Sequence, residues 1–336
     1  MTSKEYVKKL QDEAFKYDDA WEIKINDLDK DEENTLANML DRKFQKHNKE
    51  LVAGVLNPKD SNQPLVNFAK SLYNDIAYYT DNKYEELYKK TNLGFIKRGS
   101  IEAGCVSIDD FGKPFENGGY AILINIGLYY AINLLVKSII VENLQNEWEK
   151  YKQNPLPILD SAKKIYLTHD TKVIENMKFN EFPQDIAQEL SVVQANSTVR
   201  LMQFIALHEF GHIVNGDFGI MNLYHDTFVG KDINLTAKEH QKEFLADKFA
   251  LESILNKDEK ILSKWGSFYT ISYFLIWIWG LEKILNQKIS KVHPNPLDRV
   301  WYLYELMLKN HKDEYNYKAL IENAIKKVEK WIKNYN

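Results

Sequence analysis

The spacing of apolar residues along the chain predicts mostly helices and one short strand. From residue 3 to residue 92, apolar positions recur every three or four residues within Lys/Glu/Asp-rich sequence, as on helices that bury one face. The isoleucine-rich run Tyr120–Ile126 predicts a strand. The segment Leu128–Asn143 predicts a helix, and the segment Tyr317–Trp331 predicts an amphipathic one.

Two further helices are predicted in the C-terminal half. The first is almost entirely apolar over residues 201–214, with candidate N-caps at residues 196–198 and a stop at Asn215-Gly216. The second spans residues 236–251 and begins with a capping-box pattern. Together these patterns predict an α+β fold that is mainly α-helical, with a small β-sheet.

The apolar helix contains the residues His208-Glu209-Phe210-Gly211-His212, a complete HExxH motif. Its two histidines are i and i+4 on one helical face, so both imidazoles can reach one zinc ion, while Glu209 leans over the open side of the metal. A helix this apolar is buried, and buried polar groups need partners. A metal is the simplest partner; the alternative is that backbone groups nearby satisfy all three residues.

A catalytic zinc needs a third protein ligand. The sequence lacks the HExxHxxGxxH motif, so this ligand must come from elsewhere. The best candidate is Glu243, whose helix is otherwise apolar around it, and His240, one turn earlier, is its competitor. Asp247, one turn after Glu243, would accept the free ring N–H of a motif histidine. The alternative is an amphipathic helix whose acidic residues face water.

These residues carry a resemblance. Glu243-x-x-Ala246-Asp247 after an HExxH helix, followed by His293-Pro294 and Arg299, resembles the gluzincin metallopeptidases of the HtpX and CAAX-prenyl-protease type over residues 197–300. In length and general organisation the chain also resembles the soluble Lit-type phage-exclusion peptidases, which cleave a host translation factor. Either resemblance implies a zincin-like catalytic core. We expect it over residues 116–336, after an N-terminal helical region over residues 1–115.

The resemblance implies that His293 and Arg299 lie near the metal. There they would donate to the oxyanion of the reaction or orient the groups that do. The residues alone allow another interpretation, in which His293-Pro294 starts a helix and Arg299 pairs with a nearby carboxylate. The other histidines, His47, His169, His225 and His311, have no partner at a useful spacing and are predicted to face solvent.

Composition agrees with a cytoplasmic enzyme. The net charge is −4 and lysines are interleaved with carboxylates, so no basic tract predicts nucleic-acid binding. The single cysteine, Cys105, excludes an intrachain disulfide, and the first residues have no apolar signal region. The uncharged runs 118–136 and 265–281 barely reach the length of a bilayer core, so we expect buried elements there and no membrane association.

We therefore expect a zinc-dependent endopeptidase that hydrolyses a protein or peptide substrate in the cytoplasm. Zinc would activate water, and Glu209 would move its proton. Two alternatives stay open. One is a membrane-associated protease of the HtpX kind. The other is a non-catalytic regulator whose zinc is structural, with four protein ligands and His240 as the natural fourth.

Overall fold

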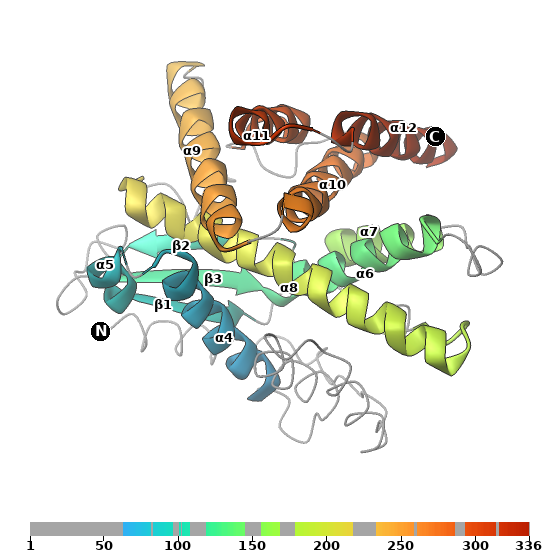
Figure 1. Cartoon of the computed structure of the whole chain (residues 1–336), viewed down its shortest axis with the longest axis horizontal. Coiled ribbons are helices and arrows are strands. Elements are labelled where there is room, and N and C mark those ends of the chain that lie inside the picture. Colours follow the sequence, from blue (N-terminus) through green and yellow to red (C-terminus); the bar gives the residue numbers. More distant parts are fainter. Residues whose placement is uncertain are drawn as a thin grey trace. The chain divides into compact units, whose positions relative to one another are not determined.

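The structure is a computed structural model of the whole chain. It describes residues 63–81, 83–96, 101, 103–107, 119–144, 156–168, 179–217, 233–258, 261–285, 293–313 and 316–335. The elements up to the sheet are α4 (Gln63–Tyr79), α5 (Glu85–Lys90), β1 (Thr91–Ile96), β2 (Ala103–Ser107) and β3 (Tyr120–Asn125). The helices that follow are α6 (Ile126–Glu142), α7 (Leu156–Thr168), α8 (Gln184–Asn215), α9 (Ile233–Lys257), α10 (Ile261–Leu285), α11 (Pro296–Asn310) and α12 (Tyr317–Tyr335) (Figure 1).

The fold class is as predicted, mainly helical with a small sheet. The three strands form one mixed sheet in the order β1-β3-β2, so the predicted strand β3 is its central strand. β3 continues directly into α6, which begins at Ile126 rather than at the predicted Leu128 and has Asn143 as its C-cap. Most of the predicted N-terminal helical region, residues 3–62, lies outside the described residues.

The chain forms two compact units. Unit 1 comprises residues 1–75, 90–103 and 121–199, and unit 2 comprises residues 76–89, 104–120 and 200–336. Both units are discontinuous in sequence, and the long helix α8 contributes its first half to unit 1 and its second half to unit 2. The predicted division of the chain at residue 116 stays a prediction.

The core of unit 1 is built around α6, of which nearly every residue is buried. Its one buried asparagine, Asn133, accepts two hydrogen bonds. The backbone carbonyl of Asn133 accepts from Gln194 Nε2 at 2.9 Å, and the side-chain Oδ1 accepts from Thr198 Oγ1 at 3.2 Å. Both partners belong to α8. A polar side chain inside an apolar helix is therefore satisfied and used to tie two helices together.

Helix α8 is longer than the sequence analysis predicted. Residues 196–198 were expected to cap its start, but the helix begins twelve residues earlier, after Pro183, whose carbonyl accepts from Ala187 N–H at 2.8 Å. Thr198 is fully helical and buried, and its hydroxyl bonds to Asn133 instead of capping. Residues with N-cap preference are tolerated inside a helix when a tertiary partner satisfies their side chains.

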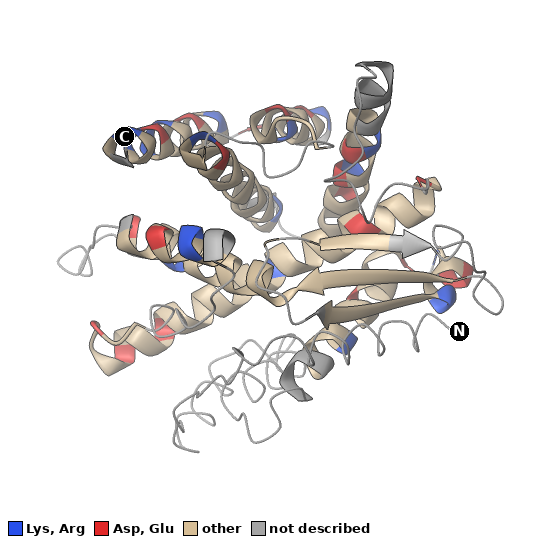
Figure 2. Ribbon diagram, turned by 180° about the vertical axis from the view of Figure 1, so that it is seen from behind, with Lys and Arg blue, Asp and Glu red and all other residues tan. Residues whose placement is uncertain are grey.

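In unit 2, α10 packs against both α11 and α12. The Trp265 and Tyr317 rings stack at 4.9 Å, and Trp331 packs with Val328 against the bare backbone at Gly280, where a Cβ would collide with Val328. The predicted amphipathic helix at the C-terminal end is thus confirmed as α12. The ribbon in Figure 2 is coloured for charged residues of both signs along α9, α11 and α12, whereas the sequences of the three strands contain no charged residue.

The two uncharged runs are parts of the folded core. Of the first run, residues 120–125 form β3 and residues 126–136 belong to α6, while residues 265–281 lie within α10. In the part of the chain that the structure describes, no helix combines the length and the apolar character that crossing a bilayer requires.

Candidate metal centre

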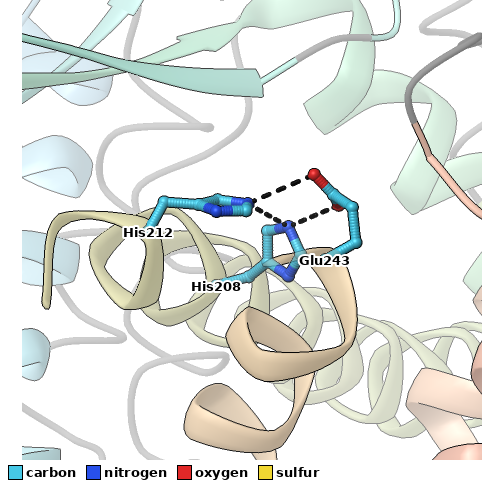
Figure 3. Close-up of side chains that lie close together, drawn as sticks. All are labelled: His208, His212 and Glu243. Atoms are coloured by element: carbon cyan, nitrogen blue, oxygen red, sulfur yellow. Dashed lines mark hydrogen bonds and ion pairs between the residues drawn. The ribbon is translucent and has the colours of Figure 1, made fainter. Parts of the chain in front are cut away.

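The HExxH motif lies in the second half of α8, where the helix is buried on all sides. Every residue from 201 to 213 is buried, including His208, Glu209 and His212 at 5 %, 7 % and 8 % exposure. The two imidazole rings meet edge to face, with their Nε2 atoms 3.2 Å apart (Figure 3). Two imidazole nitrogens at this distance can share one proton in an N–H···N hydrogen bond, or can both face one cation.

Glu243 of α9 completes this arrangement. Its Oε2 lies 3.3 Å from His208 Nε2, and its Oε1 lies 3.4 Å from His212 Nε2. One ligand atom from each of the three buried residues lies within 4.8 Å of the others, so the group could hold a metal ion. The competing candidate His240 does not belong to this group, although it lies on the same helix.

A glycine inside the motif allows α9 to approach so closely. A Cβ on Gly211 would lie 3.1 Å from Ala246 Cα and 3.3 Å from the Ala246 carbonyl oxygen. Ala246 is itself fully buried and stands between Glu243 and Asp247. Two small residues therefore bring the helix backbones together at the point where α9 must deliver both carboxylates.

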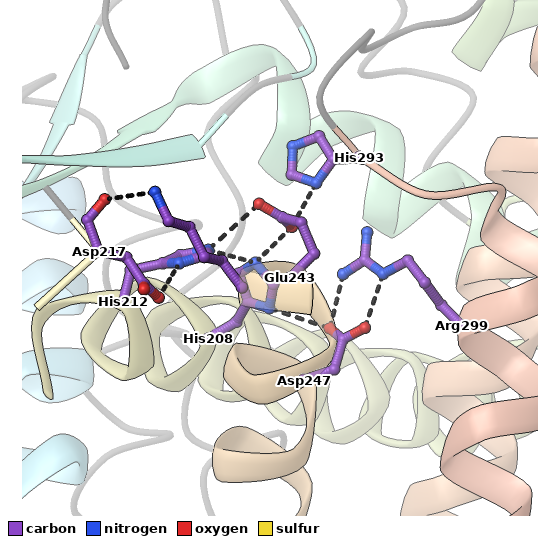
Figure 4. A network of polar contacts seen from close by, with 8 residues as sticks. His208, His212, Asp217, Glu243, Asp247, His293 and Arg299 are labelled. Carbon is purple, nitrogen blue, oxygen red and sulfur yellow. Dashed lines mark hydrogen bonds and ion pairs between the residues drawn. The ribbon is translucent and has the colours of Figure 1, made fainter. Parts of the chain in front are cut away.

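Asp247 holds the first histidine. Nδ1 of His208 donates to Asp247 Oδ1 at 2.9 Å, which leaves Nε2 directed at Glu243 (Figure 4). Arg299 of α11 binds the same carboxylate with two hydrogen bonds, Nε to Oδ2 at 2.7 Å and Nη2 to Oδ1 at 2.6 Å. Burial would raise the pKa of Asp247, but the charge and hydrogen bonds of Arg299 outweigh burial and lower this pKa to about 2.

Asp217, which the sequence analysis did not single out, holds the second histidine. Its Oδ2 lies 3.1 Å from His212 Nδ1. Burial would lower the pKa of His212, but hydrogen bonds to Asp217 and Glu243 outweigh it and raise this pKa to about 10. Burial would likewise lower the pKa of His208, and its bonds to Asp247 and Glu243 raise it instead.

His293 and Arg299 both reach this cluster. The side chain of His293 is 36 % exposed, and its Nδ1 lies 2.5 Å from Glu243 Oε2 without the geometry of a hydrogen bond. The helix start predicted near His293 is α11, with Asn295 as its N-cap, accepting from Leu297 N–H at 3.0 Å. Arg299 does pair with a carboxylate, and that carboxylate is Asp247.

The charge of Glu209 on α8 helps to raise the pKa of His212, and the thiol of Cys105 lies beside Glu209. Burial raises the pKa of Cys105 on β2 well above its ordinary value, and the neighbouring Glu209 raises it further by charge and by a hydrogen bond. Cys105 is therefore an uncharged thiol in contact with the proposed base. Of the histidines predicted to face solvent, His311 is partly exposed, and the other three lie outside the described residues.

The charges in this cluster favour a divalent cation. Four buried carboxylates, those of Glu209, Asp217, Glu243 and Asp247, surround the two motif histidines. Two basic side chains oppose them: Arg299, and Lys242, whose Nζ lies 3.5 Å from the Asp217 carbonyl. Neutral imidazoles would leave these charges with a deficit of two, and the raised pKa of His208 and of His212 means that the metal-free site meets this deficit by binding protons. Burial makes such a deficit costly, and a divalent cation would cancel it.

Comparison with known proteins agrees with the chemistry of this cluster. A family model described as Peptidase U49 matches residues 130–326, more than half of the chain, and this match includes the HExxH helix, Glu243, Asp247 and Arg299. No curated protein and no solved structure matches the chain. Of the two resemblances drawn from the sequence, the match supports the one to the Lit-type peptidases. The chain belongs to the peptidase U49 family and is a peptidase, a hydrolase that acts on protein substrates.

Proposed function

We propose that this peptidase is a zinc-dependent endopeptidase whose metal is held by His208, His212 and Glu243. The observation that carries the proposal is the convergence of two imidazole nitrogens and one carboxylate within 4.8 Å. Two nitrogens and one oxygen form a ligand set typical of catalytic zinc, which keeps a further position open for water and substrate. Calcium and magnesium prefer sets built mainly from oxygen, so this donor set favours zinc over either of them.

Zinc bound here supplies a Lewis acid that lowers the pKa of a water molecule and polarises the scissile carbonyl. The side chain of Glu209 then acts as general base: it accepts the proton of the attacking water and passes it to the amine that leaves. Glu209 suits this role because it adjoins a ligand without belonging to the group of three. His293, whose side chain is more exposed than those of His208 and His212, is proposed to donate to the developing oxyanion.

We infer that an extended substrate pairs with β2. The central strand β3 has a neighbour on each side, so it offers no free edge to a substrate. Among the described strands the edges are β1 and β2, and β2 carries Cys105, which contacts Glu209. A peptide added to the free edge of β2 would make main-chain hydrogen bonds beside the proposed base.

The test of the catalytic role is Glu209→Gln. The amide cannot accept a proton, so this variant should keep the metal and the fold but lose proteolysis. Wild type and variant are added to a cell lysate and new N-termini are labelled. Glu252→Gln, which changes an exposed glutamate of α9 in the same way, is the matched control. Cleavages should appear with wild type and control, and disappear with Glu209→Gln or a chelator. Equal patterns from Glu209→Gln and wild type would refute the assignment.

A structural metal site is the second candidate, because His293 Nδ1 lies 2.5 Å from Glu243 Oε2, although His293 is not one of the three residues whose ligand atoms lie within 4.8 Å of one another. A structural zinc has four protein ligands and no water. Zinc stoichiometry and X-ray absorption on wild type, Glu243→Ala and His293→Ala separate the two. The catalytic site requires about one zinc per chain, three protein ligands and a zinc content that His293→Ala does not change. Loss of zinc in His293→Ala would favour the structural site.

A further inference from the structure

The turn that ends α8 makes two contacts with His212, one to its backbone and one to its ring. Asp217 N–H donates to the His212 carbonyl at 3.0 Å, and Gly216 N–H donates to the Ile213 carbonyl at 3.2 Å. This pair of bonds is the Schellman motif, in which a left-handed residue follows the helix and turns the chain back over its last turn. Gly216 is that residue, with φ of +67°. The turn therefore returns the chain to His212.

The same turn places a carboxylate on the ring of His212. Asp217 is only 9 % exposed, and its Oδ2 lies 3.1 Å from His212 Nδ1. His212 thus has its backbone carbonyl bound by the N–H of Asp217 and its ring bound by the side chain of Asp217. Lys242, the residue before Glu243 on α9, lies with its Nζ 3.5 Å from the Asp217 carbonyl, so the turn also meets the helix that supplies the third ligand.

We propose that Asp217 is a positioning residue for the metal centre, which fixes His212 as the tautomer that carries its proton on Nδ1. With that proton donated to Asp217, the nitrogen that must give up its proton to a metal is Nε2, which faces Glu243. Asp247 does the same for His208, so each motif histidine has its own buried carboxylate partner. Such partners of ligating histidines orient the ring and raise its basicity. This inference rests on the proposed zinc function.

If Asp217 served only to end the helix, its carboxylate would not be needed. The Schellman turn needs only the backbone of residue 217, so an alanine there would keep the helix end and remove the carboxylate alone. Asparagine would keep an acceptor oxygen at nearly the same place and lose the charge. The two substitutions therefore separate the hydrogen bond to the ring from the capping of the helix.

The experiment measures zinc affinity by competition with a chromophoric chelator, for wild type, Asp217→Ala, Asp217→Asn and Asp185→Ala. Asp185, an exposed residue in the first turn of α8, is the control. Asp217→Ala should weaken zinc binding about 10- to 100-fold. Asp217→Asn should stay much closer to wild type, because its amide oxygen still accepts from Nδ1, and Asp185→Ala should equal wild type.

A second readout follows the ring itself. In zinc-loaded, ¹⁵N-histidine-labelled protein, long-range ¹⁵N–¹H spectra show which ring nitrogen of His212 bears the proton. Wild type and Asp217→Asn should show the Nδ1–H form, and Asp217→Asn gives this answer even where Asp217→Ala does not fold. Equal zinc affinity of wild type and a folded Asp217→Ala would overturn the inference alone. A His212 proton on Nε2 in zinc-loaded wild type would mean that Nε2 does not bind the metal, and would overturn both the proposed arrangement of the ligands and the inference. Wild type that binds no zinc would overturn the proposed function and the inference together.

Discussion

Replacing Arg299 with leucine tests how strongly the metal centre depends on the ion pair between Arg299 and Asp247, neither of which is a proposed ligand. Arg299→Leu removes both hydrogen bonds to Asp247, whose side chain has no exposure, and leaves that carboxylate buried beside His208. Leucine fills part of the vacated volume, so the perturbation is mainly electrostatic. Removing one partner of a buried ion pair typically costs about 3–5 kcal/mol.

The pKa of Asp247 gives a second measure of how much this ion pair stabilises the folded protein. A pKa lowered from 3.8 to about 2 means that the folded protein favours the ionised carboxylate by about 2 kcal/mol. Because this pKa lies below its unfolded value, the stabilisation is complete above about pH 4 and is lost as the pH falls toward 2. The free energy of unfolding of Arg299→Leu should therefore be about 3 kcal/mol lower than that of wild type at pH 7. It should also change less with pH between pH 4 and pH 2.

Urea unfolding of metal-free protein, followed by tryptophan fluorescence, measures this loss as a lower midpoint at unchanged slope. The double variant Asp247→Leu/Arg299→Leu should be more stable than Arg299→Leu alone, because no unpaired charge stays buried. Arg200→Leu is the matched control: Arg200 also pairs with a poorly exposed aspartate, Asp258, in unit 2, but Asp258 touches none of the proposed ligands. The control should lose stability and keep zinc affinity.

Arg299→Leu should also weaken zinc binding by about tenfold or more, because Asp247 then holds His208 less firmly. The reasoning would be refuted if Arg299→Leu unfolded within about 0.5 kcal/mol of wild type, the range of an ordinary surface substitution. It would be refuted equally if Arg299→Leu and Arg200→Leu changed zinc affinity by the same amount.

Three further predictions concern packing and protons. Gly211→Ala should weaken zinc binding and cost about 1–2 kcal/mol in urea unfolding despite better helix propensity, because its methyl would push the backbone at Ala246 away. Gly280→Ala should lower the thermal midpoint through its clash with Val328, and Val328→Ala should restore part of it in the double variant. Zinc affinity, measured by competition from pH 6 to pH 9, should rise with pH. The pKa of His212 in the metal-free site is raised to about 10, so a bound proton must leave before a metal can bind. An affinity that does not change with pH would contradict this.

The site residues that the sequence predicted form two sets, and the members of each set lie within one turn of each other on one helix. His208, Glu209 and His212 follow from spacing alone, because i and i+4 share a face on any helix. Glu243 and Asp247 could be singled out by the same rule, once the motif required a third ligand. Where the structure places these residues agrees with the expected arrangement, while their catalytic and metal-binding roles stay predictions.

The parts that the sequence did not predict depend on contacts between distant segments. Nothing in the short segment around Cys105 indicates that it forms an edge strand beside Glu209, because strand order is set by pairing across the chain. Asp217 did carry a local signal. Asn215-Gly216 was taken only as a helix stop, but a glycine in the left-handed conformation also returns the next residue to the last turn of the helix.

The packing of α12 against α10 determines which fragment of this chain can be expressed in folded form. The family match ends at residue 326, but Val328 and Trp331, each 3 % exposed, lie beyond it and cover the backbone at Gly280. A fragment cut at the family boundaries would uncover that surface of α10. It would also lack β2 with Cys105 and all of β3, since the match begins at residue 130. Such a fragment should aggregate, whereas one that runs from residue 63 to residue 335 keeps every described element intact.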